Sequence, residues 1–164
     1  MSATVVLFVT RDGHTRELAR ELGALLKADV LEIRDLVNRR GFFGWLRSGR
    51  QASLLAATPI EAPSLDLGKI GTVVLAQPVW ASAICPPIRT WLASNAKALA
   101  GKRIALLASA YGTPAEVLRA KFDSEFGASI GKLAACAVVA RKGGDAAPSP
   151  GPALERFAAE LARA

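Results

Sequence analysis

The sequence predicts an α/β fold, a three-layer sandwich in which helices cover both faces of a parallel sheet. The prediction rests on short apolar runs that alternate with helical periodicity along the whole chain. Most of these runs are near-continuous in Val, Leu, Ile and Ala, which is typical of strands covered on both faces. A length of 164 residues favours one domain over residues 1–164, and a hydrophobic content of 51% excludes a disordered chain.

Five segments are predicted to be strands. They are residues 4–9, 30–33, 72–76, 103–108 and 133–140. The second segment carries Glu32 among apolar residues, so we expect it to be an edge strand.

Helices are predicted where apolar side chains recur every three or four residues. One begins at Pro86 and Pro87, and the last follows the Gly- and Pro-rich stretch 143–152. The side chains expected to face the core are Leu18, Leu22, Leu25 and Leu26 in the first helix, Ile88, Trp91, Leu92 and Leu99 in the second, and Leu154, Phe157, Ala158 and Leu161 in the last.

The third helix has a start signal of its own. The run Thr113-Pro114-Ala115-Glu116 matches a capping box with proline at the first helical position. We therefore expect Thr113 to cap this helix.

Residues 37–71 form one long connection, which predicts either a functional lid or a further helix. Within it, the segment from Arg39 to Arg50 holds four arginines, three aromatic residues and no acid. Two interpretations stay open for this segment. It lies on anionic lipid or covers a quinone-like substrate, or it is a basic helix at the rim of a ligand pocket.

The net charge of +7 indicates either that the protein attracts anions or that the charge only keeps the protein in solution. No specific nucleic-acid binding is expected, because only the charge and the arginines point to it. The first apolar run lacks a preceding basic stretch and a following cleavage site, so it is predicted to be a strand rather than a secretion signal. Two cysteines provide no disulfide framework, and a cytoplasmic protein is expected.

In an open parallel sheet, ligands bind at the carboxyl ends of the strands where the winding reverses. The loop after the first strand consists of Thr10, Arg11, Asp12, Gly13, His14 and Thr15. Hydroxyl groups, a permissive glycine and the free amides of a helix start suit an anion, with Arg11 and Arg16 flanking it. A plain strand-to-helix cap is the alternative.

The loops after the third and fourth strands each place an aromatic residue among small ones. They consist of Pro78, Val79, Trp80 and Ala81, and of Ser109, Ala110, Tyr111 and Gly112. We expect Trp80 to cover a flat ring, and an ordinary half-buried tryptophan is the alternative. Together the three loops predict a planar ligand that carries a phosphate.

The segment from Val6 to Leu22 resembles the amino-terminal signature of the flavodoxin family. It has an aromatic residue, a hydroxyl residue, a small residue, a threonine and an alanine at the spacing that the signature requires. The run Pro78-Val79-Trp80-Ala81, with residues 86–92, looks like the family's second loop and the helix after it. The resemblance implies strand order 2-1-3-4-5 and noncovalently bound FMN. The phosphate would sit in the loop from Thr10 to Thr15, and the ring would lie between the loops of Trp80 and Tyr111.

Two residues depart from the family pattern. Asp12 stands where threonine is usual, and a carboxylate about 5 Å from a phosphate charge would cost about 3 kcal/mol at an effective dielectric constant of about 20. Asp12 is therefore expected to point away, as a helix cap or in a pair with Arg11. His14 replaces a common asparagine, and it either lends partial positive charge or faces solvent.

The first loop also looks like that of menaquinone-dependent protoporphyrinogen oxidase. The resemblances imply an FMN-binding protein that transfers electrons to a redox partner protein or a small quinone-like molecule. The alternatives are an FMN-dependent oxidoreductase acting on a quinone or protoporphyrinogen, and a flavin-free basic interaction protein of the same fold. A homodimer is compatible with the sequence. No residue is expected to act as a proton-transfer catalyst.

Other functions of similar folds lack their residues. Gln77 stands where a response-regulator receiver needs aspartate, and Trp91 stands where a low-molecular-weight phosphatase built on Cys85 needs arginine. One histidine does not supply a typical zinc site, and the glycine motifs of dinucleotide and nucleotide sites are missing. Cys85 is expected to be a buried spectator thiol.

Overall fold

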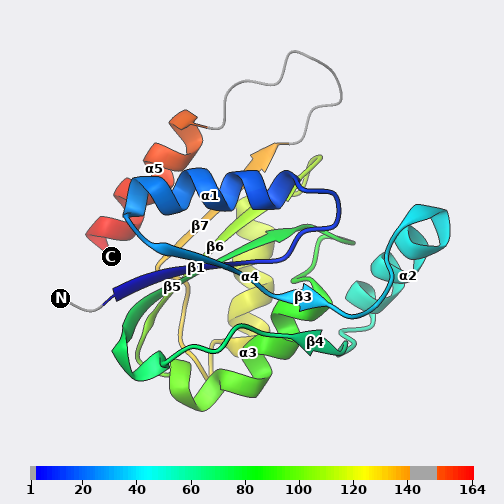
Figure 1. Cartoon of the computed structure of the whole chain (residues 1–164), viewed down its shortest axis with the longest axis horizontal. Coiled ribbons are helices and arrows are strands. Elements are labelled where there is room, and N and C mark those ends of the chain that lie inside the picture. The colour runs from blue at the N-terminus through cyan, green and yellow to red at the C-terminus, as the bar shows by residue number, and fades with distance from the viewer. Residues whose placement is uncertain (1–2, 141–150) are drawn as a thin grey trace.

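The computed structural model describes residues 3–140 and 151–164. They form an α/β sandwich around a five-stranded parallel sheet (Figure 1). The strand order is β2-β1-β5-β6-β7, which is 2-1-3-4-5 when the strands of this sheet are counted along the chain. The predicted fold class and strand order are confirmed.

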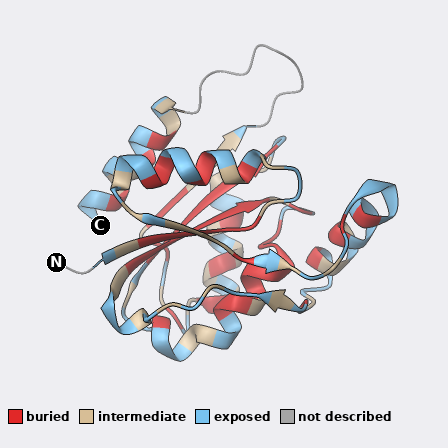
Figure 2. Cartoon of the chain, viewed as in Figure 1, coloured by how far each residue is buried: buried red, intermediate tan, exposed pale blue. Residues whose placement is uncertain are grey.

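The strands of the sheet agree with the predicted segments to within two residues at each end. They are β1 (Ala3–Phe8), β2 (Asp29–Glu32), β5 (Ile70–Pro78), β6 (Arg103–Ala110) and β7 (Ala135–Ala140). The central strands β1, β5 and β6 are buried along most of their length, whereas β2 is only partly buried and lies at the edge, as Glu32 predicts (Figure 2).

Two helices cover each face of the sheet. On one face α1 (His14–Leu26) and α5 (Gly151–Arg163) pack their apolar side chains on β1, β5 and β6. On the other face lie α3 (Pro86–Leu99) and α4 (Ala115–Phe126). Of the stretch 143–152, only residues 151 and 152 are among the described residues, at the start of α5.

The predicted inward-facing side chains are buried or packed against the core, with one exception. Leu25 is exposed, so its prediction was wrong. The buried residues of α1 end at Gly23, and Leu25 lies in the last turn between the exposed residues Ala24 and Lys27.

The start of α4 also differs from its prediction. Pro114 is the N-cap, with ψ of 150°, the helix begins at Ala115, and no side chain caps it. The extended ψ of Pro114 moves the helix start one residue along, so Thr113 and Glu116 lose the spacing of a capping box. The hydroxyl of Thr113 instead lies 3.2 Å from that of Ser82.

The long connection contains its own secondary structure, including the helix that was one of its two predicted forms. Its elements are β3 (Arg34–Asp35), α2 (Gly41–Ser53), β4 (Ile60–Glu61) and the short 3-10 helix η1 (Leu67–Lys69). β3 and β4 pair antiparallel and were not predicted, because two residues are too few to show a period. Figure 1 shows α2 standing out from the body beyond the carboxyl ends of the strands. Among the described helices, none has the length and apolar character needed to cross a membrane.

Candidate functional site at the carboxyl edge of the sheet

The loop between β1 and α1 leaves the start of the helix open. Gly13 is the N-cap residue, with φ of 97°, and no side chain caps the helix. The amide of Gly13 donates to Oγ1 of Thr10 at 2.9 Å. The first-turn amides of a helix have no partners within it, so they remain donors for a ligand. Asp12 is therefore not a helix cap, which was one of its two predicted roles.

Thr15 links this first loop to the third. Its side chain is buried, and its Oγ1 lies 3.3 Å from Oγ of Ser109 at the end of β6. Arg16, expected to flank an anion, instead binds Glu32 of β2 at 3.1 Å and lies over the ring of Phe8. Arg11 is the flanking arginine that stays at the cleft.

The second loop, between β5 and α3, contains a strained turn. Ala81 and Ser82 both have φ of 51°, a left-handed conformation that side chains disfavour. The turn is closed by a bridge between Trp80 and Ala83, whose amide donates to the Trp80 carbonyl at 3.1 Å. Such conformations cost about 1–3 kcal/mol each and occur where surrounding contacts impose them, often at ligand sites.

A buried amide side chain holds this turn in place. Gln77 is fully buried at the end of β5, and its Oε1 accepts the amide of Cys85 at 2.9 Å. Its Nε2 donates to the carbonyl of Ala83 at 3.5 Å. Gln77 was noted in the sequence only for the aspartate it replaces, and its position directly before a site loop was the available signal.

Trp80 is more buried than predicted. Its side chain belongs to the core, and the guanidinium of Arg39 lies 4.9 Å from its ring centroid. The expectation that Trp80 does not fill the core was wrong, because it packs among the buried residues around α3. Its contact with a flat ring stays a prediction. The remaining edge of Trp80 still lines the cleft described below.

The third loop, after β6, is joined to the second by the backbone. The amide of Val79 donates to the carbonyl of Ser109 at 2.9 Å. Ser109 and Ala110 are buried, whereas Tyr111 and Gly112 are exposed. Tyr111 is thus the aromatic residue of the three loops that stands open to solvent.

The three loops enclose one cleft of about 130 Å³. Its lining is Arg11 and Asp12 from the first loop, Pro78, Val79 and Trp80 from the second, Ser109, Ala110 and Tyr111 from the third, and Trp45 from α2. The sequence thus predicted that these loops meet, and it missed Trp45 as an individual residue. The other predicted residues, Thr10, Gly13, His14, Thr15, Ala81 and Gly112, do not line this cleft. Of these, Thr10 and Ala81 line neighbouring cavities.

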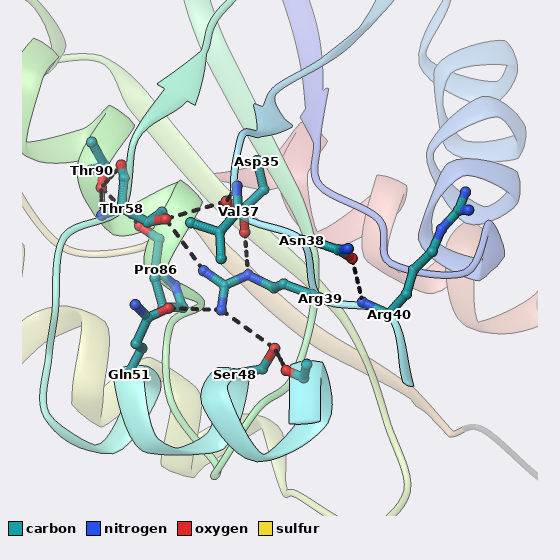
Figure 3. Close-up of polar contacts among 11 residues, drawn as sticks. Asp35, Val37, Asn38, Arg39, Arg40, Ser48, Gln51, Thr58, Pro86 and Thr90 are labelled. Carbon is teal, nitrogen blue, oxygen red and sulfur yellow. Dashed lines mark hydrogen bonds and ion pairs between the residues drawn. The ribbon is translucent and has the colours of Figure 1, made fainter. Parts of the chain in front are cut away.

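Arg39 fixes α2 beside the cleft. Its guanidinium is almost fully buried and pairs with the carboxylate of Asp35. It also donates to Gln51 at 2.8 Å, to Ser48 at 3.4 Å and to Thr58 at 3.3 Å. Figure 3 shows this one side chain reaching both α2 and the strand that leads into it.

The other arginines of the segment behave differently. Figure 3 shows Arg40 pointing away from the network around Arg39. Arg40, Arg47 and Arg50 are exposed. Arg39 therefore belongs to the fold, and only its three neighbours remain for contact with a partner.

The fit of α2 against the body depends on a glycine. A Cβ on Gly44 would lie 2.2 Å from the carbonyl carbon of Arg39, which is far inside van der Waals contact. Ser48, one turn later, is also buried and donates to the carbonyl of Gly44 at 2.7 Å. The backbone of α2 thus approaches the preceding loop directly.

A larger, mostly apolar cavity of about 520 Å³ lies between α2 and the second loop. It is lined by Trp45, Leu46, Gly49, Arg50, Ser53, Val79, Trp80 and Ala81. It shares Trp45, Val79 and Trp80 with the cleft of the three loops, so the two spaces adjoin.

The thiol near the site is unreactive in character. Cys85 is fully buried at the start of α3, and burial raises its pKa to about 12. It is therefore a protonated spectator at neutral pH, as expected from the sequence. Within the described part of the chain, no cluster of three or more His, Cys, Asp or Glu side chains is placed to hold a metal ion.

No protein-family model and no curated protein sequence matches this chain. Solved structures do match it along nearly its whole length. A candidate flavoprotein from Bacteroides uniformis superposes with a TM-score of 0.78 at 14% identity, over 96% of this chain and 98% of that one. Flavodoxin 1 of Bacillus cereus superposes with a TM-score of 0.56 at 14% identity, over 99% of this chain and 98% of that one. The chain has the flavodoxin-like fold.

A third structure with this flavodoxin-like fold contains a ligand. It is a flavoprotein from Lactobacillus acidophilus in complex with FMN, with a TM-score of 0.69 at 17% identity, over 84% of this chain and 92% of that one. At such identities the match concerns the fold, and the ligand of this chain has to be argued from its own residues.

Proposed function

We propose that the protein binds FMN noncovalently and transfers electrons through it. The observation that carries the proposal is the meeting of three loops around one cleft, beside a helix start that no side chain caps. The structural neighbour from Lactobacillus acidophilus holds FMN in the same type of fold.

The residues present fit the phosphate of FMN. The amides at the start of α1 and the hydroxyl of Thr10 provide donors, and the helix dipole adds about 0.3–1 kcal/mol for an anion. A Cβ on Gly13 would meet nothing within 4 Å, so a ligand can approach this backbone. Arg11 lines the cleft from the same loop, and so does Asp12, which was expected to point away from it.

The residues also fit the ring system of FMN. Trp45, Trp80 and Tyr111 are aromatic and line the cleft from three different segments. FMN, when bound, accepts and donates electrons one or two at a time, and the protein controls its access and potential. The strongly basic chain, with a pI of about 10.0, favours an acidic redox partner protein or a small acceptor over the basic partners that acidic carriers use.

The test of the proposal is the visible spectrum of the purified protein, followed by FMN titration of a flavin-depleted sample. A flavin spectrum that is released on denaturation supports it. Gly13→Val is expected to abolish FMN binding because its side chain blocks the backbone approach.

Gly101→Val is the matched control for this variant. Gly101 also has positive φ and open space around its Cα, but it lies in the turn between α3 and β6. Both variants put a branched side chain at a positive φ, of 97° for Gly13 and 79° for Gly101, so loss of FMN binding in the first variant alone supports a direct role of Gly13. Absence of flavin binding in the wild-type protein refutes the proposal and leaves the flavin-free interaction protein as the explanation.

A second candidate is an FMN-dependent oxidoreductase acting on a quinone or protoporphyrinogen. The adjoining apolar cavity of about 520 Å³ favours it, since this volume lies within the range of ligand pockets. Turnover assays with NAD(P)H and quinones, and with protoporphyrinogen, test it. Loss of turnover in Trp45→Ala with flavin retained supports the enzyme, and full turnover in that variant removes the proposed role of α2.

A further inference from the structure

The helix α2 packs on the body through its smallest side chains. Its buried residues are Gly44, Ser48 and Ala52, which are spaced four apart and form one stripe. An ordinary surface helix buries its large apolar side chains instead. The stability of α2 on the body therefore comes from close backbone contact and from the Arg39 network, and its large apolar side chains are left outside.

Those large side chains form a continuous patch. Phe43 is 82% exposed and Trp45 57% exposed, and Phe42 and Leu46 are exposed beside them. The ring of Phe42 lies 5.7 Å from that of Phe43 and 6.2 Å from that of Trp45. Leu54, directly after the helix, is exposed as well. A contiguous apolar patch of this kind marks a surface for a partner.

The charged side chains on α2 and directly beside it in the sequence have one sign. Arg40, Arg47 and Arg50 are exposed within or next to α2. Between Asp35 and Glu61 the chain contains no acidic residue. The combination of Phe, Trp and Leu with arginines is that of helices that lie in the interface of a membrane with anionic lipids.

The same charges argue against a second copy of the chain as the partner. In a twofold symmetric dimer the patch would face itself, and the three arginines of one copy would meet those of the other without an acidic residue between them. α2 also stands out from the body, so that a flat surface can reach it without contact from the sheet (Figure 1).

We propose that α2 is a peripheral membrane-docking element that inserts its aromatic face into the interface of an anionic lipid bilayer. The arginines beside it bind the lipid headgroups. The inference is independent of flavin binding. It places the exposed Trp45, and with it one rim of the cleft, against the bilayer surface.

The experiment is co-sedimentation of the full-length protein with vesicles of phosphatidylcholine alone and of phosphatidylcholine mixed with phosphatidylglycerol. Binding is expected only to the anionic vesicles, and added salt is expected to weaken it. Arg47→Gln with Arg50→Gln is expected to reduce the partition coefficient roughly 25-fold, at about fivefold for each arginine. Phe43→Ser is expected to reduce it at least about tenfold.

Matched controls come from the other helices. Arg20→Gln with Arg156→Gln removes two exposed arginines from α1 and α5, and Leu25→Ser removes an exposed leucine from α1. These variants are expected to bind vesicles like the wild-type protein, apart from a small effect of net charge. A blue shift of tryptophan emission on binding is expected from Trp45, because Trp80 and Trp91 are already buried.

Three results would overturn the proposal. One is the failure of the wild-type protein to bind anionic vesicles at low salt. Another is an equal loss of binding in the α2 variants and in their controls, which assigns the interaction to net charge alone. The third is a dimer in analytical ultracentrifugation that Phe43→Ser dissociates, which assigns the patch to a second copy.

Discussion

Arg39 shows how one residue of a charged segment can differ from its neighbours. The sequence presents four arginines between residues 39 and 50 with nothing to separate them. In the structure Arg39 is buried against Asp35 and Trp80, and it bonds to three further side chains. Its partners come from four different elements or loops, so no local pattern identifies it.

Replacement of Arg39 is expected to be costly. Arg39→Gln leaves the carboxylate of Asp35 buried without its charge partner, and such losses destabilise by about 3–5 kcal/mol. Urea unfolding measures the change.

The control is Arg34→Gln, which removes the exposed pair between Arg34 and Glu61 and is expected to cost less than about 1 kcal/mol. Equal effects of the two substitutions would show that the buried network contributes little beyond a surface pair.

Gln77 is the second residue whose role only the structure reveals. It lies near the end of a mostly apolar strand, and it bonds to the carbonyl of Ala83 and the amide of Cys85, both of which follow the turn. A buried amide at the end of a strand indicates a backbone that needs partners there. That backbone is the segment from Ala83 to Cys85, which directly follows the strained residues Ala81 and Ser82.

At the scale of the element, α2 is built unlike the four helices that cover the sheet. Those bury Leu, Phe, Trp or Ile side chains, which is why their apolar spacing predicts them. α2 buries Gly, Ser and Ala, and its attachment depends on how closely two backbones approach. The sequence therefore left open whether a helix was there at all.

Two glycines of α2 are expected to respond to the same substitution with opposite sign. Gly44→Ala places a Cβ against the backbone of Arg39 and is expected to loosen α2. A Cβ at Gly49 meets open space. Gly49→Ala is therefore expected to stabilise the helix by about 0.5–1 kcal/mol, which is the difference in helix propensity between glycine and alanine.

Limited trypsin digestion measures the effect, because Arg47 and Arg50 become cleavable when α2 opens. We expect faster cleavage in Gly44→Ala and slower cleavage in Gly49→Ala than in the wild-type protein. The same rate in both variants would contradict the close packing of α2.

At the scale of the whole molecule, the parallel sheet brings distant segments to one edge. Residues 10–15, 78–83 and 109–113 are far apart in the chain, and the carboxyl ends of β1, β5 and β6 place them together. Hydrogen bonds between the loops, such as that from Val79 to Ser109, then fix their spacing. The core formed by these strands and the helices that cover them also contains two cysteines, Cys85 and Cys136.

The two cysteines predict how stability depends on alkaline pH. Burial raises the pKa of Cys85 from 9.0 to about 12 and that of Cys136 from 9.0 to about 11. The unfolded chain therefore loses thiol protons at a lower pH than the folded one. Their contribution to stability is complete below pH 9.0 and is lost as the pH rises toward the folded values.

Denaturant unfolding at several pH values on either side of 9.0 measures this dependence. In Cys85→Ala the fall of the unfolding free energy above that pH is expected to be shallower than in the wild-type protein. An identical slope in the two proteins would show that other groups account for the alkaline loss. The comparison of slopes is independent of the constant cost of removing the buried side chain.

The sequence by itself determined the sheet, the four helices that cover it and the three loops at its edge. Strands buried on both faces and helices with a leucine or aromatic stripe carry their packing in their own residue pattern. The strand order followed from the family resemblance and the edge character of the segment with Glu32, and the structure agrees with both.

Only the tertiary structure decided what α2 does. The burial of Arg39, the contact of Gly44 with the preceding loop, and the exposure of Phe43 and Trp45 all depend on where that helix lies. No periodicity encodes these positions, because the buried side chains of α2 are small and the exposed ones are apolar. The physical reason is that contacts between residues far apart in the chain, rather than local preference, set the orientation of this helix.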